Sequence, residues 1–67
     1  MKIYTYKIIY RDDEQDIEEE IFTTEVEIED TPEEMESIAR ERAWEVAEDA
    51  SYDYAATSFD IQLISVD

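Results

Sequence analysis

The 67-residue chain contains no cysteine, no histidine and no glycine, and it has a single proline. Without cysteine or histidine it can form neither a disulfide nor the usual zinc site, the two supports of many small folds. A chain of this length buries only about 60% of its unfolded surface, so a well-packed minimal architecture or an oligomer must supply the stability. The missing residue types also remove imidazole bases, thiol nucleophiles and glycine-rich phosphate loops. We therefore expect a protein that is not an enzyme and that binds no cofactor.

Positive charge is scarce as well, because 21 acidic residues face only five lysines and arginines and the formal net charge is −16. Self-repulsion on this scale destabilises the compact state, keeps the protein soluble and attracts basic partners. Direct binding to nucleic acid is not expected, because phosphate contacts need lysine and arginine. No stretch approaches eighteen apolar residues, and the N-terminal MKIYTYKIIYRDD has no uninterrupted apolar run. We expect a soluble protein of the host-cell cytoplasm that does not enter a membrane.

The hydrophobic pattern, with 43% apolar residues, indicates a folded chain and one α+β domain of element order ββαβ. Alternating side chains predict strands over residues 2–11, 17–29 and 57–66. A stripe at 3.6-residue spacing predicts a helix over residues 32–50. A hairpin followed by a right-handed crossover gives a three-stranded antiparallel sheet of order 2-1-3 with the helix on one face. The predicted core consists of Tyr4, Tyr6, Ile8, Phe22, Val26, Ile28, Met35, Ile38, Ala39, Ala43, Val46, Phe59, Ile61 and Leu63.

The start of the helix has the clearest local signal. In the segment DTPEE, Thr31 occupies the N-cap, Pro32 the first helical position and Glu34 the capping-box position. Acidic residues in this first turn also suit the positive end of the helix dipole.

The segment DDEQD connects the first two strands without a glycine. We therefore predict a loop of four or five residues and not a tight primed turn. Asp12, Glu14 and Asp16 alternate like the first ligands of a calcium loop, but Ile17 and Thr23 stand where an EF-hand needs glycine and glutamate. A solvated connection is favoured over weak, non-specific divalent binding, and we expect no metal site.

Trp44 lies nearly opposite Met35 and Val46 on the predicted helix, away from the core. It can be covered by Arg40, one turn earlier, in a cation–π contact. It can instead be an exposed anchor of an interface, where tryptophan is enriched. A third possibility is that it caps the edge of the domain beside residues 51–56.

The sheet face without a helix is predicted to mix apolar and charged side chains: Ile3, Lys7, Ile9, Glu19, Ile21, Glu25, Glu27, Ile64 and Val66. An ordinary half-solvated face is one interpretation. Pairing with a second copy of the chain, or with a target, is the other.

The acidic residues have three interpretations. They can serve solubility alone, although mixed charges would do so with less repulsion. They can form a docking surface for a basic protein, or they can mimic nucleic acid. On an extended strand alternate residues repeat every 6.6–6.8 Å or so, comparable to successive phosphates. The acidic residues predicted to project in this way from the second strand are Glu19, Glu25, Glu27 and Glu29, and the helix adds Glu33, Glu34, Glu41, Glu45 and Glu48.

Two strands followed by VEIEDTPEEMESIARERAWEVAE and a last strand resemble small acidic phage-encoded ββαβ inhibitor proteins. The architecture is similar to that of the small RNA polymerase inhibitors of T7-type phages. In size, charge and lack of catalytic groups the chain is also similar to anti-CRISPR and anti-restriction DNA mimics. The resemblance implies stoichiometric inhibition of a host nucleic-acid-binding machine.

The sequence therefore predicts a non-enzymatic phage or mobile-element inhibitor whose acidic surface occupies the basic channel of a CRISPR effector, a restriction enzyme or an RNA polymerase. The predicted partner-binding residues are Glu19, Glu25, Glu27, Glu29, Glu41, Trp44, Glu45 and Glu48. The alternative is a small acidic interaction or regulatory module, with a homodimer through the outer sheet face. A small-molecule or metal binder is a third, weaker hypothesis.

Overall fold

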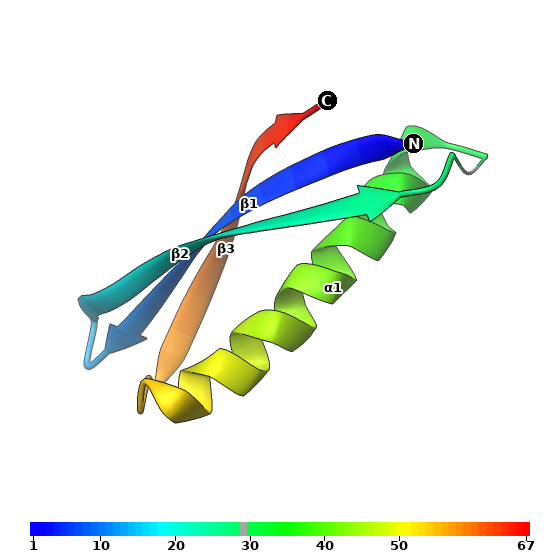
Figure 1. The fold of residues 1–67 in the computed structure, drawn as a ribbon. Coiled ribbons are helices and arrows are strands. Elements are labelled where there is room, and N and C mark those ends of the chain that lie inside the picture. Colours follow the sequence, from blue (N-terminus) through cyan, green and yellow to red (C-terminus); the bar gives the residue numbers. More distant parts are fainter. Residues whose placement is uncertain (29) are drawn as a thin grey trace.

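A computed structural model gives the fold and describes residues 1–28 and 30–67. The elements follow the order β1 (Lys2–Asp12), β2 (Gln15–Val26), α1 (Pro32–Asp53) and β3 (Ser58–Val66). The three strands form one antiparallel sheet of order β2-β1-β3, and α1 lies across one of its faces (Figure 1). The predicted fold class is thereby confirmed. No helix in the described ranges is long and apolar enough to cross a membrane.

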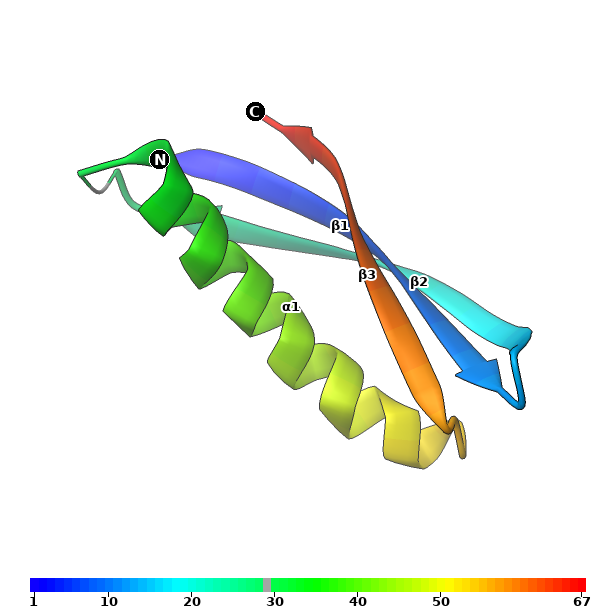
Figure 2. The same cartoon turned by 180° about the vertical axis from the view of Figure 1, so that it is seen from behind.

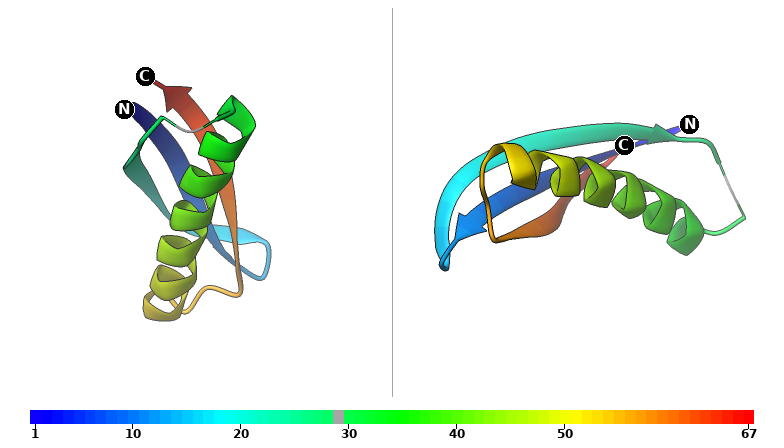
Figure 3. Two further views of the ribbon diagram at one scale, coloured as in Figure 1. Left: turned by 90° about the vertical axis from the view of Figure 1, so that its right-hand side faces the viewer. Right: turned by 90° about the horizontal axis from the view of Figure 1, so that it is seen from below.

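The central strand β1 alternates strictly between the two faces. Tyr4, Tyr6, Ile8 and Tyr10 point toward α1 and are buried, and their registered partners on β3 include Ile61. The sheet curves around the helix, as the view from below shows (Figure 3). The N-terminal half of α1 lies beside β2 and its C-terminal half beside the start of β3, as Figures 1 and 2 show from opposite sides.

The hairpin between β1 and β2 differs from the prediction. Asp12 pairs with Gln15, so the loop has only two residues, Asp13 and Glu14. Their φ angles are 51° and 68°, the left-handed conformation at both central positions that a type I′ turn requires. The prediction of a longer loop was wrong because it treated the missing glycine as excluding this turn. Aspartate tolerates the left-handed region, and here a glutamate occupies it too.

Each outer strand contains a β-bulge. On β2 the partners of Tyr10 and Arg11 are Glu18 and Asp16, so Ile17 is the extra residue. On β3 the partners of Thr5 and Tyr6 are Ser65 and Leu63, so Ile64 is the extra residue. β1 itself is regular opposite both bulges.

Both ends of α1 are capped. Thr31 has an extended backbone, and its Oγ1 accepts a hydrogen bond of 3.2 Å from the Glu34 N–H, which confirms the predicted N-cap with Pro32 following it. At the other end Ala55 has φ 56°, and its N–H donates to the Tyr52 carbonyl. The Ala56 N–H donates to the Ser51 carbonyl at 2.9 Å, which completes a Schellman motif with alanine in the position usually held by glycine.

The core lies between β1 and a stripe of α1 with four-residue spacing. Small alanines on this stripe let the helix approach the tyrosines of β1 closely. The Tyr6 hydroxyl donates to the Glu36 carbonyl at 3.4 Å, which satisfies it inside the protein. The core cluster consists of Tyr4, Tyr6, Ile8, Tyr10, Val26, Met35, Ala39, Ala43, Ala47 and Ile61, with Phe22, Ile38, Ala50, Ala56 and Phe59 packed against it.

Three predicted core residues are exposed. Ile28, at 75% exposure, follows the end of β2, which stops at Val26 and not at the predicted residue 29. Val46 is 37% exposed because a stripe that repeats every four residues drifts around the helix and leaves this position at its margin. Leu63, at 40%, lies on the part of β3 that diverges from α1 (Figure 1).

Tyr10 was missing from the predicted core although it is fully buried. The helix continues to Asp53, three residues beyond its predicted end at residue 50. The longer helix places the Tyr54 ring 4.8 Å from the Tyr10 ring, so that the end of β1 is covered.

Candidate functional site

The predicted partner-binding residues lie on two opposite layers of the molecule. Glu19 and Glu25 are exposed on the outer face of the sheet, opposite Ile9 and Ile3 of β1. The acidic residues of α1 lie on the other layer, beyond the core. One flat partner surface therefore cannot contact both sets at once.

The predicted row of glutamates along one strand is interrupted. Between Glu19 and Glu25 the outer face of β2 carries Ile21 and Thr23. Glu27 is exposed in the connection after β2, and Glu29 lies outside the described residues. Because β2 ends at Val26, Glu27 lies beyond the strand and does not continue the phosphate-like spacing from Glu25.

The helix carries the denser acidic surface. All the acidic residues of α1 are exposed: Glu33, Glu34, Glu36, Glu41, Glu45, Glu48, Asp49 and Asp53. Its two cations are Arg40 and Arg42, and Arg42 points back to the sheet. The Arg42 guanidinium donates to Thr24 Oγ1 at 3.1 Å and to the Glu25 carbonyl at 2.7 Å, so it ties α1 to β2.

Little of the negative charge is neutralised within the described residues. Lys7 Nζ lies 3.5 Å from Glu19 Oε2, and Arg11 Nε donates to Asp16 Oδ1 at 2.8 Å. Both pairs lie on the outer sheet face and are solvated, and such pairs contribute about 0–1 kcal/mol each. The outer sheet face is thus partly compensated, and the helix surface is not.

Trp44 packs at the edge of the domain, which agrees with the third of the interpretations given above for this residue. Its side chain is 52% exposed, and its ring lies 4.8 Å from that of Phe59 at an interplanar angle of 66°. Among the described residues Trp44 makes this ring contact with Phe59 and no cation–π contact with Arg40. Trp44 therefore presents one side to Phe59 and the other to solvent.

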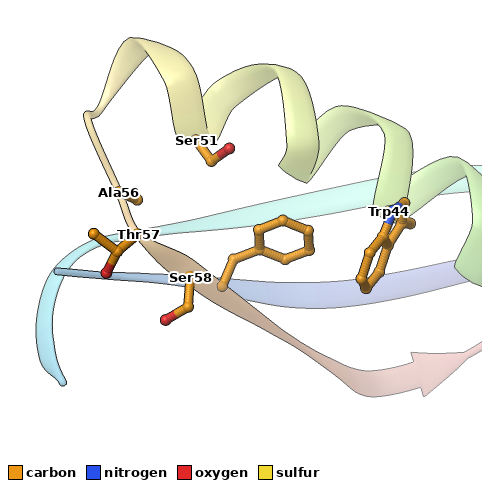
Figure 4. A pocket seen from close by; sticks show the side chains of 6 residues that line it. Trp44, Ser51, Ala56, Thr57 and Ser58 are labelled. Atoms are coloured by element: carbon orange, nitrogen blue, oxygen red, sulfur yellow. The ribbon is translucent and has the colours of Figure 1, made fainter. Parts of the chain in front are cut away.

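A shallow hollow of about 240 Å³ opens between the C-terminal half of α1 and the start of β3 (Figure 4). Its walls are Trp44, Ser51, Ala56, Thr57, Ser58 and Phe59. Ser51 Oγ donates to the Glu48 carbonyl at 2.7 Å. Thr57 Oγ1 lies 3.3 Å from both the Arg11 carbonyl and the Asp13 N–H, and so links the hollow to the hairpin turn.

Apart from Trp44, the predicted site residues did not include the walls of this hollow. One signal was available for Ser51, which follows Trp44 by seven residues and so lies two helical turns along the same side. Thr57 and Ser58 carry no comparable signal, because their place beside the helix depends on the length of α1.

A tyrosine–carboxylate cluster lies at the hairpin end of the sheet. The Tyr10 hydroxyl donates to Glu20 Oε1 at 2.5 Å. Burial raises the pKa of Tyr10 well above its ordinary value, and the hydrogen bond and charge of Glu20 raise it further. Burial and the nearby charges of Glu20 and Glu18 also raise the pKa of Tyr54. These phenols stay protonated at neutral pH, and Tyr10 acts as a structural donor to Glu20.

The outer sheet face carries exposed isoleucines: Ile3 at 38% exposure and Ile21 at 63%. Ile9 follows Lys7, the partner of Ile21, by two residues and is only 6% exposed, although no helix covers this face, so its strand neighbours shield it. Val66 was predicted here, but the bulge at Ile64 pairs it with Tyr4 and moves it to the helix side.

The described surfaces differ in charge, in exposed aromatic area and in apolar content. No three acidic side chains in residues 1–28 and 30–67 converge closely enough to hold a metal ion. The hollow at Trp44 is smaller than the roughly 300–1,000 Å³ typical of small-molecule sites. The structure thus offers an uncompensated acidic helix, one half-exposed tryptophan and a partly apolar sheet face.

Comparison with known proteins gives no relative from which a role could be transferred: no protein-family model, no curated protein and no solved structure matches this chain.

Proposed function

We propose that this chain is a non-enzymatic inhibitor of the phage or mobile-element type, and that its acidic helix binds the basic groove of a nucleic-acid-binding protein in competition with DNA or RNA. The observation that supports this proposal is the exposed, unneutralised carboxylate surface of α1. A rigid helix presents these charges at fixed spacing, which favours electrostatic complementarity with a groove lined by lysine and arginine. CRISPR effectors, restriction enzymes and RNA polymerases are candidate targets because each holds nucleic acid in such a groove.

The geometry supports the helix over β2 as the surface for this role. On the outer sheet face Lys7 and Arg11 lie among the acidic residues and pair with Glu19 and Asp16. On α1 the glutamates Glu41, Glu45 and Glu48 stand on consecutive turns of the outward side.

Competition with nucleic acid tests the proposal. Each candidate target is loaded with fluorescently labelled DNA or RNA, and displacement by the protein is followed by anisotropy from about 50 to 200 mM salt, a range over which phosphate-type contacts weaken strongly. We expect displacement that weakens steeply as salt rises. The variant with Glu41, Glu45 and Glu48 all changed to lysine should bind at least about tenfold more weakly, since each exposed pair contributes up to about 1 kcal/mol.

The matched control changes Glu19 and Glu25 of the sheet to lysine and should leave displacement within about twofold of the unmodified protein. If only this control variant lost activity, the sheet and not the helix would be the binding surface. If the unmodified protein displaced nucleic acid from none of the three target classes, the proposed inhibition would be refuted.

A second candidate function, a homodimer through the outer sheet face, is favoured by the exposed Ile3 and Ile21. Lys7 and Arg11 lie on this face and offset part of its negative charge. Sedimentation at micromolar concentration distinguishes a homodimer from a monomer. A dimer should dissociate in Ile21→Glu, and a monomer whose mass is the same with and without this change would exclude dimerisation through this face.

A further inference from the structure

The hollow beside Trp44 has an aromatic end and a hydroxyl-bearing end (Figure 4). Trp44 stands on the helix at one end, and Ser51, Thr57 and Ser58 lie toward the other. Because Phe59 covers only part of the indole, about half of the Trp44 side chain remains open to solvent. An open indole face attracts cations through its quadrupole.

Carboxylates predominate among the charged groups around the hollow. Glu48 follows Trp44 by four residues and therefore lies on the same side of α1, between Trp44 and Ser51. Ser51 Oγ donates a hydrogen bond of 2.7 Å to the Glu48 carbonyl, so Glu48 adjoins the Ser51 wall of the hollow. Glu41, one turn before Trp44, is exposed as well. Of the two arginines near this turn, Arg42 is bound to β2 and Arg40 is exposed. The surroundings thus attract a positive group and repel a negative one.

The shape and lining favour arginine over lysine. A guanidinium is planar and weakly hydrated, so it can stack on an indole and still donate from its edge to hydroxyl and carboxylate oxygens. An ammonium group is compact and strongly hydrated, and it loses more on entering a hollow that is partly apolar. A volume of about 240 Å³ accommodates one long side chain and not a drug-sized molecule.

We propose that this hollow is a receptor for one arginine side chain of the basic partner, stacked on Trp44 and oriented by the Ser51 hydroxyl and by the carboxylate of Glu48, one turn beyond Trp44. This inference rests on the proposed function, because it assumes a basic protein partner, and it adds an anchor with side-chain specificity. The acidic helix attracts the partner over a distance, and the hollow fixes which residue of the partner is held.

The single tryptophan of the chain makes the test direct, because its fluorescence reports on this hollow alone. The protein is titrated with hexa-arginine, hexa-lysine and hexa-citrulline, and binding is followed by Trp44 emission and by amide NMR shifts. Hexa-arginine should shift the Trp44 emission and the amides of Ser51 and residues 56–59. Hexa-lysine should bind the acidic helix with a much smaller effect on Trp44. Citrulline, which has the shape of arginine without its charge, should not bind.

Variants separate the hollow from the acidic surface. Trp44→Leu keeps an apolar cover on Phe59 and should bind hexa-arginine about fivefold more weakly, which corresponds to loss of a cation–π contact of about 1 kcal/mol. Trp44→Phe should bind hexa-arginine with an affinity between those of the unmodified protein and Trp44→Leu. It also provides a folded comparison if the leucine variant is unstable. Tyr52→Leu changes an aromatic residue of the same helix that is 80% exposed and away from the hollow, and it should bind like the unmodified protein.

The outcomes distinguish this inference from the proposed function. Tight binding of hexa-arginine that leaves Trp44 and its variants unaffected would overturn the arginine receptor and leave the acidic docking surface standing. A peptide alternating lysine and norleucine that shifts Trp44 as strongly as hexa-arginine would also overturn it, because the occupant would then be apolar. Failure of every cationic peptide to bind at low salt would instead contradict the proposed function itself.

Discussion

Glycine substitution at the left-handed positions should stabilise this protein, although glycine usually weakens a fold. Glu14 in the hairpin turn and Ala55 at the end of α1 have φ of 68° and 56°. A residue with a β-carbon costs about 1–2 kcal/mol in this conformation, and glycine adopts it freely. Glycine also increases the entropy of the unfolded chain, which opposes the gain by about 0.5–1 kcal/mol. The net gain at each position should be about 0.5–1 kcal/mol.

Urea unfolding followed by Trp44 fluorescence and by circular dichroism measures this gain. For a domain of this size, 1 kcal/mol corresponds to a shift in the melting temperature of about 4–8 °C, so each of Glu14→Gly and Ala55→Gly should raise it by about 2–8 °C. The two sites lie at the same end of the molecule, since Thr57, two residues after Ala55, bonds to the Asp13 N–H. The double variant must therefore be measured, because additivity holds only for independent sites.

Two control variants separate the backbone effect from the loss of charge and from the general cost of glycine. Glu14→Gln deletes the same negative charge without relieving the backbone, so it isolates the electrostatic part of the change. Ser37→Gly places glycine at an exposed, right-handed position of α1 and should cost about 0.5–1 kcal/mol. If Glu14→Gly and Ala55→Gly lowered the stability as Ser37→Gly does, the stabilisation expected from φ would be refuted.

Other properties of the fold can be tested in the same unfolding assay. Thr31→Ala should lower the free energy of unfolding by about 1 kcal/mol through loss of the helix N-cap, and Thr31→Ser should retain most of it. Ala43→Leu should cost about 1–3 kcal/mol, because the helix stripe has no space for a larger side chain; a stable variant would show that the helix can move away from β1. Added salt should raise the melting temperature, because it screens the repulsion of a chain with net charge −16, and no response would show that this repulsion is already relieved. At alkaline pH the unfolded chain loses its tyrosine protons from about pH 10, whereas the raised pKa of Tyr10 keeps its proton in the folded state. The stabilisation associated with Tyr10 is thus complete below about pH 10 and decreases as the pH rises further; Tyr10→Phe should flatten this decline, and an equal pH dependence in both proteins would contradict it.

The sheet order and the helix could be predicted because their signals are local and agree with one another. The alternation of Tyr4, Tyr6 and Ile8 defines the buried face of β1, and Thr31 with Pro32 defines the start of the helix. Both the buried face of β1 and the start of the helix are determined by a few residues that are neighbours in the sequence.

The features that could not be predicted depend on distant parts of the chain. Burial of Tyr10 requires Tyr54, which reaches it only because α1 extends beyond residue 50. The bulge at Ile64 is a mismatch between two strands, and neither strand alone signals it; it moves Val66 to the other face. The same holds for the candidate site, because Ser51 and Phe59 become neighbours of Trp44 only when the last strand docks beside the helix.

The two bulges affect how this sheet meets other sheets. Both lie in strands that have a free side, Ile17 in β2 and Ile64 in β3, and neither lies in the central strand. A free strand with a regular row of unpaired amides is a template on which a second molecule can add and extend a cross-β assembly. An extra residue breaks that row and bends it, so an incoming strand finds only a short matching segment. A protein without disulfides, prolines or glycines in its strands can in this way keep its sheet at three strands and resist fibril growth.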